Sequence, residues 1–198
     1  MGQPDLSALM ELMALNLAAL DSIEDKSSML TKIMYRLGHW VNRNTVTKSK
    51  ENIEAHYDLG NSLYETFLDD RMLYSSGIYQ ADTDTLEQAQ LNKMERLCQQ
   101  LKLKPSDQVI EIGTGWGGMA IYMAKHYGCH VTTTTISEEQ YAYAQQLVEK
   151  EGLGDKITLL KQDYRLLEGQ YDKLVSIEMI EAVGKQFLVS YLKNASRC

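Results

Sequence analysis

The stretch that decides the fold is "QVIEIGTGWGGMAIYMAKHYG", residues 108–128. A short apolar run leads into a turn with glycine at alternate positions, Gly113, Gly115 and Gly117, and an amphipathic segment follows. Glycine lets the backbone approach a ligand closely, and the free N–H groups at the start of a helix bind anions and polar groups. The pattern predicts a strand, a ligand-holding turn and a helix, with a purely structural turn as the alternative.

The same alternation continues on the carboxyl side of this stretch. The apolar and β-branched runs that predict strands lie at 108–113, 130–137, 157–163 and 173–179. Helical segments near 117–126 and 138–150 separate the first three. Alternation of this kind predicts an α/β fold, with a parallel sheet that has helices on its faces. With four strands, the apolar run "LVSI" at 174–177 is expected close to an edge of the sheet.

The amino-terminal half has a different character. Helical periodicity covers 4–20, 27–41 and 85–103, and the stretch between them is aromatic and irregular. In the third helix the apolar stripe is expected to consist of Leu86, Ala89, Leu97 and Leu101. The predicted organisation is a helical segment, a helical cap and an α/β domain, over residues 1–50, 51–104 and 105–198.

The charge of the chain limits the kinds of partner that it is expected to bind. The net charge of −7 argues against nucleic acid as the main partner. Residues 26–50 are the exception, because they carry only Lys and Arg among their charges and form an amphipathic pattern with Trp40. Such a helix suits a membrane surface, or else it packs on its own domain with a solvated basic face.

The cellular location follows from what the sequence lacks. The three cysteines are widely spaced, which fits reduced thiols better than disulfides or a metal site. There is also no apolar run long enough to span a bilayer and no cleavage signal near the start. A cytoplasmic location is therefore expected.

The acids around the glycine turn indicate the ligand. A dinucleotide site needs an acid at the end of the second strand, and here that strand ends in threonines and Ser137. Acids stand instead before the glycines, at Glu111, and after the third strand, at Asp163. Acids and glycines in these places suit a ligand with an amino-acid tail, a ribose and an adenine, which is S-adenosylmethionine.

Six motifs carry a resemblance to a known family, in the family's order and spacing. They are "HYDLGN" at 56–61, "LDDRMLYSSGIY" at 68–79, "EIGTGWGG" at 111–118, "TISEEQ" at 135–140, "QDYR" at 162–165 and "SIEMIEAVG" at 176–184. On these motifs the chain resembles the cyclopropane-fatty-acyl-phospholipid synthases and their mycolic-acid relatives, a branch of the class I methyltransferases.

The resemblance implies a fold and a reaction. The fold is a Rossmann-like methyltransferase sheet, incomplete here at about four strands and preceded by a helical cap. The reaction transfers a methylene from S-adenosylmethionine to a cis double bond of a phospholipid acyl chain, with bound bicarbonate as the base. The partners implied are phospholipid acyl chains at the membrane surface, so that a cytoplasmic enzyme would work at the inner face of the membrane. A homo-oligomer is possible, and the sequence leaves the oligomeric state open.

The resemblance also implies site residues, which are carried over by position. Those expected to bind the cofactor are Tyr74, Ser75, Gly113, Gly115, Trp116, Gly117, Thr135, Gln140, Asp163 and Tyr164. Those expected to serve catalysis at the bicarbonate site and the mouth of the pocket are Glu181, Ser76 and His56.

Several of these residues have a structural alternative. Tyr74 and Tyr164 also suit half-buried core aromatics, and Trp116 suits packing. Gln140 forms a helix-capping pattern with Ser137. Glu181 suits the first turn of a helix, and His56 could simply bridge backbone groups in an aromatic turn.

Two departures from the family pattern bear on activity. Ser76 stands where the family usually has Cys, and the chain stops before the later strands that supply further residues to the bicarbonate site. The chain is therefore expected to be an internal fragment with impaired activity. The alternatives are a non-catalytic piece that binds cofactor or lipid, the product of a disrupted gene, and a small-molecule methyltransferase.

Overall fold

The computed structural model describes residues 61–183, Leu188 and Tyr191. The chain divides into two compact units, Met1–Arg43 and Asn44–Cys198, and every described residue belongs to the second. The helices predicted at 4–20 and 27–41 lie outside the described residues, as do the basic segment and His56.

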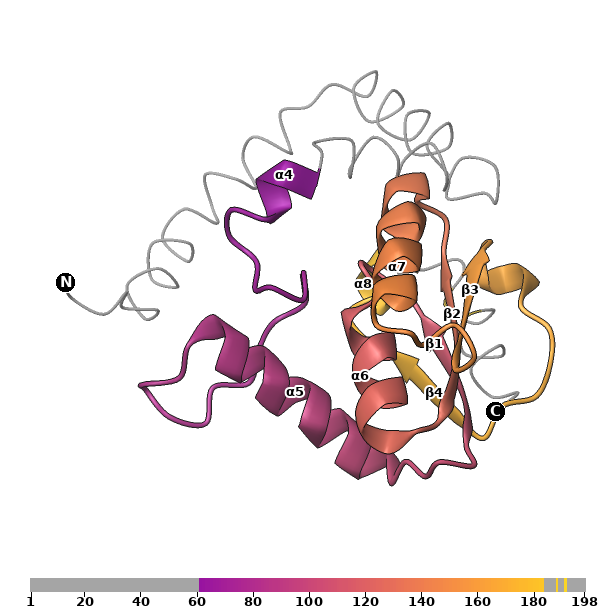
Figure 1. Ribbon diagram of the computed structural model, residues 1–198, viewed down its shortest axis with the longest axis horizontal. Helices are drawn as coiled ribbons and strands as arrows, with labels where there is room; N and C mark the ends of the chain where they lie inside the picture. Colours follow the sequence, from indigo (N-terminus) through magenta and orange to yellow (C-terminus); the bar gives the residue numbers. More distant parts are fainter. Residues whose placement is uncertain (1–60, 184–187, 189–190, 192–198) are drawn as a thin grey trace, which may run out of the picture. The chain divides into compact units, whose positions relative to one another are not determined.

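The described residues form a four-stranded parallel sheet (Figure 1). The strands are β1 (Gln108–Ile112), β2 (His130–Thr135), β3 (Ile157–Lys161) and β4 (Lys173–Ser176), in the order β3-β2-β1-β4. The predicted α/β fold is confirmed, and β4 lies at an edge of this sheet as expected. Each strand ends one to three residues earlier than predicted, because the residues that follow it already belong to the next loop, even where they are apolar, as at Ile136 and Ile177.

Within the described part of the chain, six helical segments accompany the sheet. They are α4 (Asn61–Tyr64), α5 (Leu86–Leu101), α6 (Gly118–Tyr127), α7 (Glu138–Lys150), the 3-10 turn η1 (Tyr164–Leu166) and α8 (Ile180–Val183). The bounds of α7 are those predicted, because the Ser137 hydroxyl accepts a hydrogen bond from the Gln140 N–H and starts the helix there. Among the described helices, none has the length and apolar character needed to cross a membrane.

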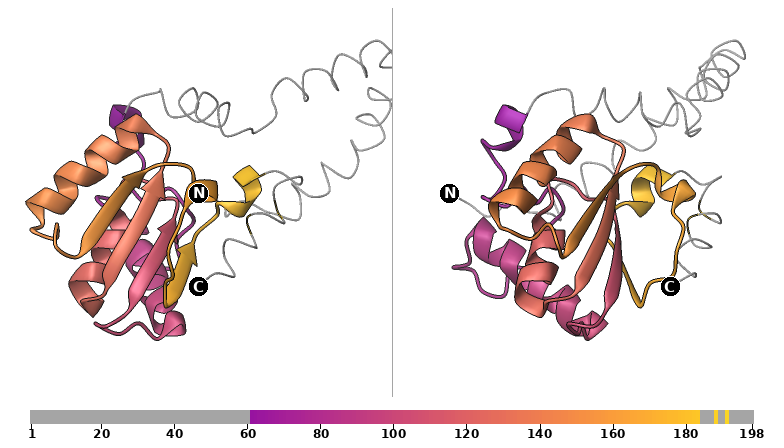
Figure 2. Two further views of the ribbon diagram at one scale, coloured as in Figure 1. Left: turned by 90° about the vertical axis from the view of Figure 1, so that its right-hand side faces the viewer. Right: turned by 45° about the vertical axis from the view of Figure 1, so that its right-hand side comes forward.

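Helices α5, α6 and α7 cover one face of the sheet (Figure 2). The buried residues there come from these three helices, from all four strands and from adjoining loops, and Val109, Val131 and Met123 are almost completely buried. On the opposite face Ile110 and Ile112 pack against Val183 and Tyr191. Residues on β1 thus alternate between two apolar layers, as buried parallel strands require.

The buried stripe of α5 differs from the predicted one. Of the four residues expected, only Ala89 is fully buried, while the three leucines are half-buried at the margin. The buried positions are Ala89, Gln90, Lys93, Met94 and Cys98. Two polar side chains therefore occupy a helix face that the sequence pattern assigned to leucine.

Candidate functional site

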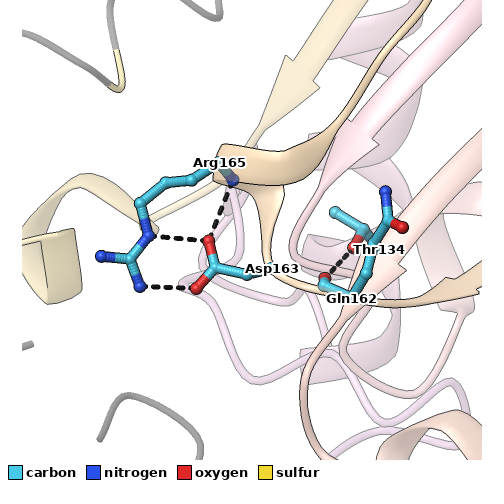
Figure 3. A network of polar contacts seen from close by, with 4 residues as sticks. All are labelled: Thr134, Gln162, Asp163 and Arg165. Carbon is cyan, nitrogen blue, oxygen red and sulfur yellow. Dashed lines mark hydrogen bonds and ion pairs between the residues drawn. The ribbon is translucent and has the colours of Figure 1, made fainter. Parts of the chain in front are cut away.

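The carboxyl ends of the strands are tied together at one edge of the sheet. Gly113 N and Thr114 N both donate to Thr134 O at 3.1 Å, which joins the ends of β1 and β2. The Thr134 hydroxyl donates to Gln162 O, which joins β2 to β3 (Figure 3). In a parallel sheet this is the edge at which ligands bind.

The three glycines of the turn have left-handed backbone conformations, with φ of 97° at Gly113, 53° at Gly115 and 94° at Gly117. A Cβ at Gly113 would lie 2.7 Å from the side chain of Met179. A Cβ at Gly117 would lie 3.1 Å from that of Ala144. At Gly115 a Cβ would meet no atom within 4 Å. Gly113 and Gly117 therefore allow close packing, whereas the backbone at Gly115 faces open space.

Trp116 anchors the turn from inside. Its side chain is 2% exposed, its Nε1 donates to Asn61 Oδ1 at 2.8 Å, and its ring centroid lies 4.8 Å from that of Tyr64. Tyr74 contacts the same Tyr64 ring edge-on, at 5.9 Å, but is 55% exposed. The packing alternative therefore fits Trp116, and Tyr74 is left as the accessible aromatic residue beside the turn.

The loop that carries Tyr74 and Ser75 is held by a buried carboxylate at its start. Asp69 Oδ1 accepts from Leu73 N at 2.9 Å. The same loop lies against the start of α6, because a Cβ at Gly118 would come 2.8 Å from Arg71 O. The loop is thereby set next to the glycine turn, over the carboxyl edge of the sheet.

Ser75 and Ser76 have different partners. Lys93 Nζ donates to Ser75 Oγ at 2.7 Å, and Gln90 Nε2 donates to Ser75 O at 2.8 Å. Ser76 donates twice to Glu178 Oε1, from Oγ at 2.6 Å and from N at 3.1 Å. Both donors of Ser76 are therefore already bonded to a carboxylate.

Thr135 and Gln140 are brought together after β2. The Thr135 hydroxyl donates to Gln140 Oε1 at 3.0 Å and accepts from Ser137 N at 3.2 Å. In a full capping box the Gln140 side chain would bond Ser137 N itself. Ser137 is the cap of α7, and the Gln140 carboxamide is directed instead to Thr135, at the end of β2.

Asp163 is bound by a neighbouring side chain. Arg165 donates to it from the backbone N at 2.9 Å, from Nε at 2.8 Å and from Nη2 at 2.5 Å (Figure 3). Hydrogen bonding to Asp163 raises the pKa of Arg165 above its already high value. The Tyr164 ring packs edge-on against Tyr191, which fits its core-aromatic alternative.

A buried polar chain runs under the glycine turn. Thr133 Oγ1 donates to Glu111 Oε2 at 2.6 Å and shares a 2.7 Å hydrogen bond with Thr114 Oγ1. Burial raises the pKa of Glu111 to about 8, although the bond from Thr133 acts to lower it. The Glu111 carboxyl is therefore mostly protonated at neutral pH.

The remaining predicted site residues are Glu181 and His56. Glu181 belongs to α8, directly after the loop that follows β4, and His56 lies outside the described residues. No cluster of three His, Cys, Asp or Glu side chains suitable for a metal occurs in the described part of the chain. The roles predicted for Glu181 and His56 stay predictions.

Sequence reasoning missed four residues that organise this edge: Tyr64, Gln90, Lys93 and Glu178. Gln90 and Lys93 share a helical stripe with Met94, a spacing that could have placed them on the buried face. Glu178 has a φ of 54°, which is uncommon for a residue with a side chain. No local pattern predicts its bond to Ser76, 102 positions away.

Comparisons with known proteins match the sequence of this chain to a family and to two curated relatives. A model of the mycolic acid cyclopropane synthetase family matches residues 44–198. The chain is 41% identical over 146 residues to a probable fatty acid methyltransferase of Pseudomonas putida. It is 45% identical over 144 residues to the cyclopropane-fatty-acyl-phospholipid synthase of Escherichia coli K12. Each match covers 73% of this chain but only 37% and 36% of the respective relative.

A similar fold occurs in a solved structure. The crystal structure of mycolic acid cyclopropane synthase CmaA1 complexed with SAH and CTAB superimposes with a TM-score of 0.72 and 28% sequence identity. The superposition covers 75% of this chain and 52% of that protein.

Proposed function

The chain belongs to the mycolic acid cyclopropane synthetase family, and on that basis we propose that it binds S-adenosylmethionine at the carboxyl edge of its sheet. The family membership confirms the resemblance that the motifs predicted. We further propose that the protein transfers the methyl carbon of S-adenosylmethionine to a cis double bond of a phospholipid acyl chain, which adds a methylene to the double bond and releases S-adenosylhomocysteine and one proton as the cyclopropane ring closes. The chain spans about a third of the length of the two curated relatives, which are named a fatty acid methyltransferase and a cyclopropane synthase.

One observation carries the cofactor proposal. Gly115 is the one glycine of the turn whose backbone faces open space, and the exposed Tyr74 lies beside that turn. An extended ligand can lie against a backbone that carries no Cβ, and the residues expected at its ribose end, Thr135 and Gln140, already bond to each other at the end of β2. This set of groups fits the cofactor. When bound, S-adenosylmethionine supplies an activated methyl group.

In the proposed reaction, the chain's own residues serve mainly to position the reactants and to exclude water from the site. Trp116 and Tyr64 form a buried aromatic wall behind the turn, and the loop around Ser75 lies beside it. An unactivated alkene is a weak nucleophile, so the reaction depends on alignment in a dry site more than on acid–base groups. The arrangement suits that requirement.

Bicarbonate fits the described residues poorly at Ser76. Its two donors are bonded to the Glu178 carboxylate, and a second anion beside that carboxylate would be repelled. The proposal therefore includes no step through bicarbonate. Phospholipid acyl chains at the membrane surface remain the proposed substrate.

The first experiment is calorimetric titration of the chain with S-adenosylhomocysteine (SAH), the demethylated form of the cofactor. Saturable binding is expected, and Gly115→Val is expected to abolish it by filling the open side of the turn. Gly152→Val is the matched control, because Gly152 also has a positive φ, of 67°, and open space where a Cβ would stand, but lies after α7. A folded chain that shows no saturable binding would overturn the proposal.

The second experiment tests the reaction. The chain is incubated with S-adenosylmethionine and vesicles of a phospholipid with monounsaturated acyl chains, and the acyl chains are analysed by NMR. Cyclopropane ring protons support the proposed reaction. A methyl or methylene branch would assign the chain to acyl-chain methylation, and SAH binding without either product would reduce the proposal to cofactor binding.

A further inference from the structure

Helix α5 directs two buried polar side chains at the loop that carries Tyr74 and Ser75. Gln90 is 2% exposed and Lys93 is 4% exposed. They stand three positions apart, so they are neighbours on one face of the helix. Lysine is almost never fully buried unless its ammonium has partners. The groups that Gln90 and Lys93 bind therefore indicate the role of these two side chains.

Their partners are all in one loop. Lys93 Nζ donates to Ser75 Oγ at 2.7 Å and to Ser75 O at 3.1 Å. Gln90 Nε2 donates to Ser75 O at 2.8 Å and to Leu73 O at 3.1 Å. Residues 72–79 form neither helix nor strand. The path of this loop is therefore set by side chains of α5 rather than by a backbone ladder.

The other side of the loop is bound by a carboxylate. Glu178, in the loop after β4, accepts two hydrogen bonds from Ser76. Adjacent residues are thus held by groups of opposite charge, with the Lys93 ammonium at Ser75 and the Glu178 carboxylate at Ser76. This arrangement leaves the Tyr74 side chain pointing outward, 55% exposed, next to the glycine turn.

We propose that Lys93 is a positioning residue, which holds Ser75 so that Tyr74 and Ser75 lie where they contact S-adenosylmethionine. This rests on the proposed function, because it takes these two residues as cofactor contacts. Lys93 itself acts through Ser75 and does not touch the cofactor. Its loss would leave Ser75 Oγ without this donor and Ser75 O with Gln90 alone.

The role of Lys93 depends on its charge. Burial lowers the pKa of Lys93 to about 8, while the carboxylates of Glu178 and Asp69, which face it from two different loops, act to raise it. An ammonium is a stronger donor than a neutral amine. The hold on Ser75 is therefore expected to weaken as the pH rises through about 8.

The test is SAH titration of wild type, Lys93→Met and Arg96→Met from about pH 6.5 to 9.5. Near neutral pH, Lys93→Met is expected to bind SAH about tenfold more weakly, because both hydrogen bonds from the Lys93 ammonium to Ser75 are lost. The ratio of its Kd to that of wild type should fall toward one above about pH 8, when wild type loses its own ammonium. Titration of the ligand cancels in this ratio.

Arg96→Met is the matched control. It removes the same charge from the same helix at an exposed position, and should bind like wild type throughout. Equal affinity of Lys93→Met and wild type near neutral pH, or a reduced affinity whose ratio does not change with pH, would overturn the proposal.

A double-mutant cycle tests the route through Ser75. In a Ser75→Ala background, adding Lys93→Met should weaken SAH binding less than it does in wild type, because the hydrogen bond from Lys93 Nζ to Ser75 Oγ is already gone and only the one to Ser75 O is left to lose. Fully additive losses would overturn the route through the Ser75 hydroxyl.

Hydrogen exchange without ligand separates this proposal from the proposed function. Lys93→Met should speed exchange in peptides covering 72–79, which include the Ser76 amide bonded to Glu178, and Arg96→Met should not. If wild type fails to bind SAH, the proposed function fails, and this measurement still decides whether Lys93 holds the loop. Unchanged exchange would overturn that role.

Discussion

Ser76 and Glu178 are 102 positions apart in the chain, and the Ser76 hydroxyl donates a 2.6 Å hydrogen bond to Glu178 Oε1. The same oxygen accepts from the Ser76 amide at 3.1 Å. This contact joins the loop before α5 to the loop after β4. The two motifs "YSSG" and "SIEM", which look independent in the sequence, therefore form one local structure.

Gly113→Ala should destabilise the protein through a clash as well as through backbone strain. The added Cβ would stand 2.7 Å from Met179, at a φ of 97°. Gly169→Ala is the control, because Gly169 has a similar φ of 111° and a Cβ there would meet Tyr171 only at an ordinary contact distance of 3.5 Å, so it reports the strain alone. Urea denaturation should show that the free energy of unfolding falls by about 1 kcal/mol more in Gly113→Ala than in Gly169→Ala. Equal losses would mean that Met179 moves aside freely.

Arg165→Met should leave a buried carboxylate without its cation. Arg165 makes three hydrogen bonds to Asp163, and both side chains are largely buried. A loss of about 3 kcal/mol in the free energy of unfolding is expected. Lys161→Met is the control, because it breaks an exposed pair with Glu138 and should lose less than about 1 kcal/mol. Similar losses in the two variants would contradict the assignment.

Glu111→Gln should change how stability depends on pH. The folded state raises the pKa of Glu111 from 4.5 to about 8, so it binds this proton more tightly than the unfolded chain does. In wild type, this group therefore lowers the free energy of unfolding as pH rises from about 4.5 to 8.

The glutamine keeps an oxygen for Thr133 and has no proton to lose. Its free energy of unfolding, relative to wild type, should rise by at least about 1 kcal/mol between pH 5 and 8. Urea titrations at a series of pH values measure this difference, with the exposed Glu168→Gln as control. A difference that is constant with pH would show that the burial of Glu111 has no energetic effect.

Ser137→Ala should reduce stability without weakening SAH binding. Ser137 caps α7, as Thr85 caps α5, by accepting from the N–H three residues on. Ser137→Ala and Thr85→Ala should each lower the free energy of unfolding by about 1 kcal/mol, as measured by thermal or urea denaturation. Gln140→Met, by contrast, should weaken SAH binding, since Gln140 is bonded to Thr135 at the end of β2. Weaker SAH binding by Ser137→Ala would instead place Ser137 in the ligand site.

The sheet was predictable because its signals are local. Each strand is a short apolar or β-branched run, and the helices between them have caps or glycines at their ends, as at Ser137 and Gly128. The strand ends were less predictable. Residues such as Ile136 and Ile177 continue the apolar pattern, although they come after the last residue of the strand.

The supports of the candidate site were harder to predict. Helical spacing puts Gln90 and Lys93 beside the apolar stripe, but their polarity suggests exposure, and they are buried because they bind carbonyls of a loop 15 to 18 residues earlier. The resemblance supplied Tyr74 and Ser75, and the glycines were already indicated by the pattern of strand, turn and helix. It was the structure that added Lys93, Glu178 and Tyr64, since these residues act through contacts between distant segments.

The strand order has a consequence for how the chain folds. β1 lies between β2, its neighbour in sequence, and β4, whose first residue is 61 positions after the end of β1. At about 5 to 20 residues per second, a ribosome needs roughly 3 to 12 s to complete that interval. During that time Val109–Ile112 can pair on one side only. Nascent chains arrested before Lys173 should therefore bind chaperones and aggregate more readily than chains arrested after Ser176.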